Sequence, residues 1–175
     1  MAISDIWERG IQELVAVRRK AIDSERGELP SPRPPAREDE LAAAEKHLGI
    51  SFDLGYRDFM QHANGWDGIC GDILFGTHEF LGGNDLLRIA TECFDAYVEF
   101  RDEWVEPTPL DGVSSGDLLA IGINNWTGAM TFIGKEGRPC AGQVFHIYNT
   151  AITLNDDFIV FFQRYVDFQR EVSEL

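Results

Sequence analysis

The sequence lacks the features that mark secreted, membrane-spanning and disulfide-rich proteins. It contains no apolar run of about 18 residues, the length needed to cross a bilayer. Asp5 and Glu8 stand near the start, whereas a secretion signal begins with a basic region followed by an apolar one. Three cysteines, Cys70, Cys93 and Cys140, are an odd number at wide spacing. We therefore expect a cytoplasmic protein with reduced, mostly buried thiols.

Motifs of catalysis and metal binding are also missing. The four histidines lie fifteen or more residues apart, and no His-x-x-x-His or Cys-x-x-Cys pair occurs. The sequence has no Gly-x-Ser-x-Gly elbow, Walker loop or dinucleotide fingerprint. We expect no metal, no cofactor and no enzymatic activity. Trp66 with Asp67 and Asp72 most resembles a sugar site, so a carbohydrate-binding or hydrolytic domain stays open as an alternative.

Positive charge is scarce over most of the chain. The net charge of the 175 residues is −15, yet residues 1–38 hold seven acidic and seven basic side chains, so the imbalance lies in residues 39–175. Between Asp58 and Gly134, thirteen acidic residues occur with only Arg88 and Arg101. Such a field repels nucleic acid and anionic membranes and attracts basic proteins. We expect no direct binding to nucleic acid or to membranes. The alternative explanation of the acidity is that it only keeps the protein soluble.

Residues 39–65 predict two short amphipathic helices joined by a glycine turn. Gly49 stands where a left-handed residue closes a helix, and Asp53 is a plausible N-cap for the next one. Apolar residues recur at helical spacing in both segments: Leu41, Ala44 and Leu48 in the first, then Tyr56, Phe59, Met60 and Ala63 in the second. Asn64 and Gly65 end the second run.

The residues of this corner resemble the signature of the SUKH superfamily, which contains bacterial toxin-immunity proteins and fungal regulators of cell-wall synthesis. The matching positions, which we expect to be structural, are Glu45, Leu48, Gly49, Tyr56, Phe59, Asn64 and Gly65. The chain departs from the pattern at Phe52-Asp53, where Leu-Pro is usual, and at Arg37, where a Ser or Thr cap is usual. An Asp cap can replace Pro at a helix start.

The remaining pattern predicts an α+β fold with a mainly antiparallel sheet of four to six strands. We expect residues 1–23 to form an N-terminal helix, 24–38 a proline-rich tether and 39–175 a single domain. Turn residues are expected at 66–68. Strands are expected at 69–75, 118–123, 128–133 and 143–148, and helices over 87–104 and from 158 onward.

A stripe of acidic residues on the helix that begins near Leu87 is the best candidate for a binding face. Asp95, Glu99 and Glu103 lie four residues apart, which lowers the intrinsic stability of the helix. A solvated face tolerates this cost, whereas a face that docks a cation would give it a purpose. Tryptophans that are exposed in loops are suited to anchor a partner protein. Each of the two candidate tryptophans could equally well belong to the hydrophobic core. The candidate toxin-binding residues are Asp95, Glu99, Asp102, Glu103, Trp66, Asp67 and Trp126.

The resemblance implies an immunity protein of a polymorphic toxin system, which neutralises a cognate toxin by binding it and covering its active site. The charge favours a basic partner, a nuclease or a nucleic-acid deaminase, because such enzymes need cationic grooves. Regulatory scaffolds like the fungal members, which carry long disordered extensions, form the alternative of a different class. Sequence leaves the oligomeric state open.

Overall fold

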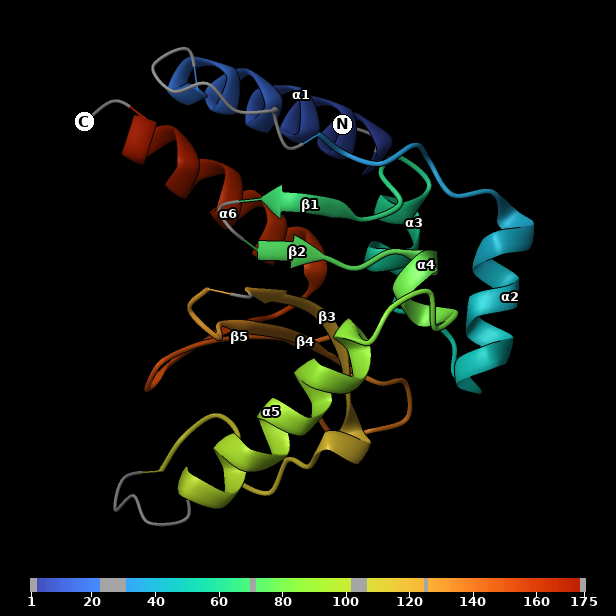
Figure 1. The fold of residues 1–175 in the computed structure, drawn as a ribbon, viewed down its shortest axis with the longest axis vertical. Coiled ribbons are helices and arrows are strands. Elements are labelled where there is room, and N and C mark those ends of the chain that lie inside the picture. Colours follow the sequence, from blue (N-terminus) through green and yellow to red (C-terminus); the bar gives the residue numbers. More distant parts are fainter. Residues whose placement is uncertain (1–2, 23–30, 70–71, 102–106, 125, 174–175) are drawn as a thin grey trace.

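The computed structural model describes residues 3–22, 31–69, 72–101, 107–124 and 126–173 (Figure 1). The helices in these ranges are α1 (Ile3–Ile22), α2 (Glu38–Leu48), α3 (Leu54–Met60), α4 (Thr77–Phe80), α5 (Leu86–Arg101), the 3-10 helix η1 (Ser115–Asp117) and α6 (Phe158–Ser173). The strands are β1 (Trp66–Ile69), β2 (Asp72–Leu74), β3 (Leu118–Asn124), β4 (Met130–Gly134), β5 (Val144–Tyr148) and β6 (Ala151–Asn155).

The six strands form one sheet in the order β1-β2-β3-β4-β5-β6, and every neighbouring pair is antiparallel. The predicted α+β class and the mainly antiparallel sheet are confirmed. Two local predictions are wrong. The predicted strand over 69–75 is divided between β1 and β2, which pair antiparallel, because Ile69 ends β1 and Asp72 begins β2. Residues 66–68 belong to strand β1 and not to a turn. Trp66 pairs with Leu74 and buries its ring, and this burial outweighs the turn chemistry of Asp67 and Gly68. The sequence pattern also did not predict β6.

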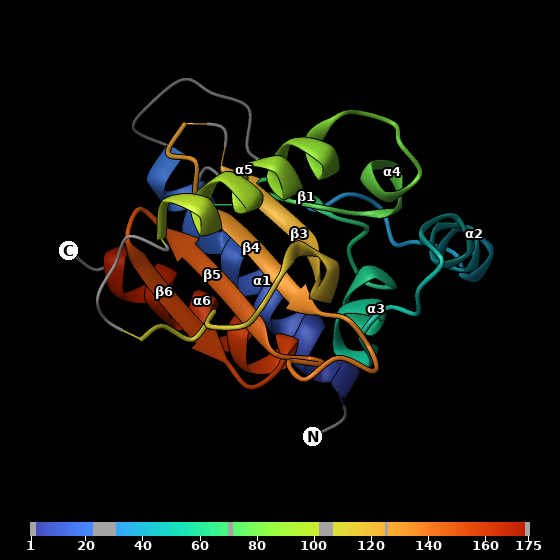
Figure 2. The same cartoon turned by 90° about the horizontal axis from the view of Figure 1, so that it is seen from below.

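Helices cover both faces of the sheet (Figures 1 and 2). Helix α5 packs on one face, where the ring centroid of Phe94 lies 4.8 Å from that of Phe132. Helices α1 and α6 lie behind the other face, which carries Thr131 and His146. Side chains of successive strand residues point to opposite faces. Phe132 therefore lies on the face covered by α5, and Thr131 lies on the face covered by α1 and α6.

Helix α1 belongs to the hydrophobic core. The predicted helix in residues 1–23 is present, and its Trp7 is fully buried. The Trp7 ring centroid lies 5.6 Å from that of Phe59, 5.9 Å from Phe158 and 5.3 Å from Phe162, and its indole Nε1 donates a hydrogen bond to Asp58 at 2.7 Å. The helix is therefore held by aromatic packing and by a satisfied polar atom.

The described part of the predicted tether is fixed to the domain. The N–H of Arg33 donates to the carbonyl of Gly65, and the N–H of Ala36 donates to that of Met60. The guanidinium of Arg33 makes ion pairs with Asp67 and with Glu79, whose side chain is fully buried. The irregular backbone of this segment is stabilised by main-chain hydrogen bonds and side-chain ion pairs instead of the hydrogen bonds of a helix or sheet.

The α2–α3 corner has the predicted caps. Gly49 adopts a left-handed conformation with φ of 67°, and its N–H bonds to the carbonyl of Glu45. The carboxylate of Glu45 accepts the N–H of Phe52, which fixes the turn, and half-buried Leu48 packs on the core. Asp53 accepts the N–H of Tyr56 at 3.0 Å, so an Asp cap does begin α3.

The buried Glu79 carboxylate makes stability depend on pH. Burial alone would raise its pKa, but hydrogen bonds from Arg33 and the Gly76 N–H lower it below the ordinary value. A carboxylate with a lowered folded pKa stabilises the protein above its unfolded pKa, and that stability is lost as the pH falls through the folded value.

We expect Glu79→Gln to lower the free energy of unfolding at pH 7 by about 2 kcal/mol, less than for a fully buried pair because Arg33 is partly solvated. The difference in the free energy of unfolding between the parent and the variant should stay constant down to about pH 5 and disappear below about pH 4. Urea denaturation at several pH values measures it, with exposed Glu136→Gln as the control. A difference that does not change with pH would show that the carboxylate charge is not stabilising.

Candidate protein-binding surface

The sheet has two ends with different surroundings (Figure 1). Helices α2, α3 and α4 gather at one, which we name the helix end. The β3–β4 turn (124–129) and the β5–β6 turn (149–150) lie at the other, which we name the turn end. The C-terminal half of α5 also runs toward the turn end.

The signature residues at the helix end have structural contacts. The Tyr56 hydroxyl donates to the carbonyl of Phe75, and its ring lies beside that of buried Phe59. The Asn64 side chain both accepts the N–H of Thr77 at 2.8 Å and donates to its Oγ1 at 2.7 Å. Gly65 has φ of 84°, and a Cβ there would lie 2.8 Å from the carbonyl oxygen of Leu74, so only glycine fits. These side chains hold α3 to the β2–α4 junction and are not free to bind a partner.

Trp126 is the most exposed large apolar side chain that the structure describes, at 93%. The described residues of its turn are joined by hydrogen bonds: the side-chain oxygen of Asn124 accepts the N–H groups of Trp126 at 2.9 Å and of Thr127 at 3.0 Å. The N–H of Gly128 also bonds to the main-chain carbonyl of Asn124. The ring is therefore presented to water beside residues that are held by hydrogen bonds to Asn124.

Beside this turn, a cleft of about 570 Å³ opens between α6 and the sheet. Phe161, Tyr165 and Phe168 line it from α6, with Tyr148 from β5. Phe168 and Tyr148 are 57% and 47% exposed. The remaining lining is mostly polar: Asn124, Thr127, Ala129, His146, Ala151, Thr153, Asn155 and Arg164. A cleft with aromatic side chains from α6 on one wall and polar groups from the sheet on the other suits a side chain or small ligand better than an ion.

Asp95 and Glu99 are exposed on α5, as the acidic stripe predicts. Arg101, the local cation that would offset them, is buried and points to Thr108 and Asp111 instead. Their charge is thus not neutralised by Arg101. Helix α5 and the cleft lie on opposite faces of the sheet, so the acidic residues and the cleft form separate parts of the turn end.

Two predicted site residues do not fit a binding surface at the turn end. Trp66 is 1% exposed, so its assignment as a surface anchor is wrong, because strand β1 points its ring into the core. Asp67 lies at the start of β1, near the helix end, and is held by the guanidinium of Arg33. Asp102 and Glu103 lie outside the described residues.

The described residues include no group of three or more His, Cys, Asp or Glu side chains placed to hold a metal ion. Nor does any described helix have the length and apolar character to cross a membrane. His146, in the cleft, contacts the hydroxyl of Thr131 through Nδ1 at 3.0 Å. Cys140 is buried as expected, and burial raises the pKa of its thiol, whereas Cys93 is exposed and departs from the expectation. Cys70 falls outside the part of the chain that the structure describes.

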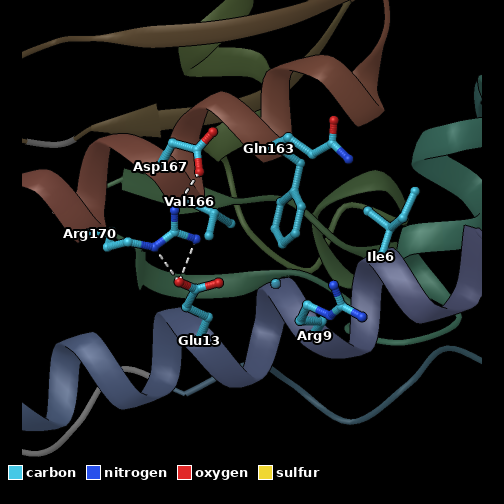
Figure 3. Close-up of a pocket in the computed structure, with 9 residues that line it drawn as sticks. Ile6, Arg9, Glu13, Gln163, Val166, Asp167 and Arg170 are labelled. Carbon is cyan, nitrogen blue, oxygen red and sulfur yellow. Dashed lines mark hydrogen bonds and ion pairs between the residues drawn. The ribbon is translucent and has the colours of Figure 1, made fainter. Parts of the chain in front are cut away.

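A second, smaller groove of about 230 Å³ runs between α1 and α6 (Figure 3). Arg170 crosses it to pair with Glu13 of α1 and also bonds to Asp167 on its own helix. At Gly10, an added Cβ would lie 2.5 Å from the ring of Phe162, so the helices touch closely here. The groove is a packing seam closed by ion pairs, and we assign no ligand to it.

Comparison with known families matches residues 35–164 to the SMI1 / KNR4 family (SUKH-1). The match covers about three quarters of the chain and includes the α2–α3 corner, the whole sheet and the beginning of α6. It confirms the predicted SUKH relationship. A search of curated proteins finds no match.

The two tryptophans are expected to differ sharply when each is replaced by alanine. Trp126→Ala should leave the melting temperature unchanged, because the ring loses almost no packing. Trp66→Ala should lower the free energy of unfolding by about 3–5 kcal/mol, the usual cost of a large cavity in a core. Thermal and urea denaturation of both variants measure this. A large loss of stability in Trp126→Ala would show that the ring packs on the protein.

Proposed function

The chain belongs to the SMI1 / KNR4 family (SUKH-1), and on that premise we propose that it is a non-enzymatic immunity protein. It binds a cognate bacterial toxin and neutralises it by covering the toxin's active site. The observation that carries the proposal is Trp126, a 93% exposed aromatic ring on a hydrogen-bonded turn. Tryptophan is enriched among the residues that contribute most to protein interfaces, and the hydrogen bonds from Trp126 and Thr127 to Asn124 reduce the backbone entropy that binding has to remove.

The charge of the chain favours a basic toxin. The net charge is −15, and Asp95 and Glu99 extend this field over exposed α5 without compensation from Arg101. Nucleases and deaminases that act on nucleic acid need cationic grooves, which an acidic protein can occupy. Complementary charge accelerates encounter, while a desolvated aromatic anchor slows dissociation.

Reversing the charge of Asp95 and Glu99 to lysine should slow association with a basic nuclease toxin encoded beside this chain. We expect the association rate constant to fall by about tenfold at low salt. At about 0.5 M salt the variant and the parent should associate at nearly the same rate, because exposed charges are then screened. The melting temperature should stay level or rise as the like-charge repulsion on α5 is relieved. Stopped-flow mixing at several salt concentrations gives the association rates.

The matched control reverses Glu8 and Glu136, two exposed carboxylates away from the turn end, and changes the net charge equally. If both double variants slow association by the same factor, only the overall charge matters and α5 is not the steering face. If the parent chain neither binds the toxin nor protects cells that express it, the proposed function itself fails.

A further inference from the structure

Strand β6 leaves one edge of its main chain without a partner among the described segments. It is the last strand of the sheet, and its pairing is with β5 alone. On the outer side of β6, Nη1 of Arg164 lies 3.5 Å from the carbonyl oxygen of Leu154. This distance is long for an N–H···O hydrogen bond. Residues 151–155 are mostly exposed.

The ladder identifies which main-chain groups face outward. The N–H of Gly134 in β4 bonds to the carbonyl of Gln143, so the alternate residues that include Phe145 and Ile147 bond to β4. The other residues of β5, at 144, 146 and 148, therefore bond to their partners at 155, 153 and 151. This leaves the N–H and C=O groups of Ile152 and Leu154 directed away from the sheet.

The strand itself lacks the usual protection against a further strand, although Arg164 of α6 lies at its end and donates to the Asn155 side chain at 2.9 Å. Proteins normally guard an exposed edge with charge, proline, a bulge or a covering segment. The β6 sequence, Ala-Ile-Thr-Leu-Asn, contains no charge and no proline. At the opposite edge of the sheet, Pro32 bridges to Trp66 and so covers part of β1. The difference indicates that the β6 edge is left open for a partner.

The cleft beneath α6 lies on one face of this edge. Ala151, Thr153 and Asn155 line the cleft, whereas Ile152 and Leu154 point to the other face. A strand added to β6 would continue the pleat and place every second side chain over the cleft of about 570 Å³, beside exposed Phe168. Main-chain bonds would give affinity, and the cleft would select apolar side chains.

We infer that β6 docks an extended segment of the basic partner protein, in which apolar residues alternate and lysine or arginine flanks them. The inference rests on the proposed function and gives its mode of binding. A basic segment is favoured because Asp156 and Asp157 follow the strand directly and the chain carries a charge of −15. A second copy of the chain carries the same charge and would be repelled.

The test uses the full chain and the basic nuclease toxin encoded beside it. Amide hydrogen exchange, followed by NMR, should slow at least about tenfold at Ile152 and Leu154 in the complex, because each N–H gains a hydrogen bond. Leu154→Pro removes one outward N–H at a position where an edge strand tolerates proline. It should weaken binding by about tenfold with the melting temperature almost unchanged.

Leu54→Pro is the matched control. Leu54 is exposed at the first position of α3, where proline is favoured, and it lies at the helix end. A complex in which exchange at β6 is unchanged and Leu154→Pro binds like the parent overturns the edge inference and leaves the proposed function standing. Absence of any complex overturns both. A dimer that forms with rising concentration in sedimentation, with β6 protected in the free chain, also overturns it.

Discussion

The packing of Trp7 against Phe59, Phe158 and Phe162 is the constraint on which the rest of the structure depends. These rings come from α1, α3 and α6, and their centroids lie within 5.3–5.9 Å of that of Trp7. One side of α6, with Phe162 and Val166, is committed to α1 and the core. The neighbouring side, with Phe161, Tyr165 and Phe168, then faces the sheet and lines the cleft. A single broad apolar face on α6 thus serves both stability and the candidate surface.

Under the proposed function, this arrangement separates the structural and binding roles between the two ends of the sheet. At the helix end, the signature residue Asn64 exchanges two hydrogen bonds with Thr77, and Arg33 pairs with the buried carboxylate of Glu79. At the turn end, Trp126, the open cleft and the unpaired edge of β6 are exposed together. Loops and strand edges of this kind can change in sequence without loss of the core, which suits the turn end to the proposed role in binding.

The sequence predicted the elements whose signals are local. Helical spacing located α1, α2, α5 and α6, the caps at Gly49 and Asp53 followed from turn chemistry, and the β3–β4 hairpin followed from its two apolar runs. Features set by tertiary contacts were missed. Trp66 was misplaced because nothing local distinguishes a buried tryptophan from an exposed one. Strand β6 was missed although it is as long as β4 and β5, because periodicity in so short a run does not distinguish a strand from other structure. The cleft joins residues from β3 to α6, so no sequence pattern describes it.

The central claim, that a partner docks at the turn end and not at the helix end, is tested most directly by photo-cross-linking. A benzophenone amino acid placed at position 126 or at position 54 replaces an exposed apolar side chain in each case, 93% and 83% exposed. Irradiation of each labelled chain with the proposed basic toxin partner, followed by mass spectrometry, compares the two ends at similar accessibility. We expect covalent adducts with the toxin from position 126 and none from position 54. Adducts from position 54 alone would contradict the claim and place the interface over α3.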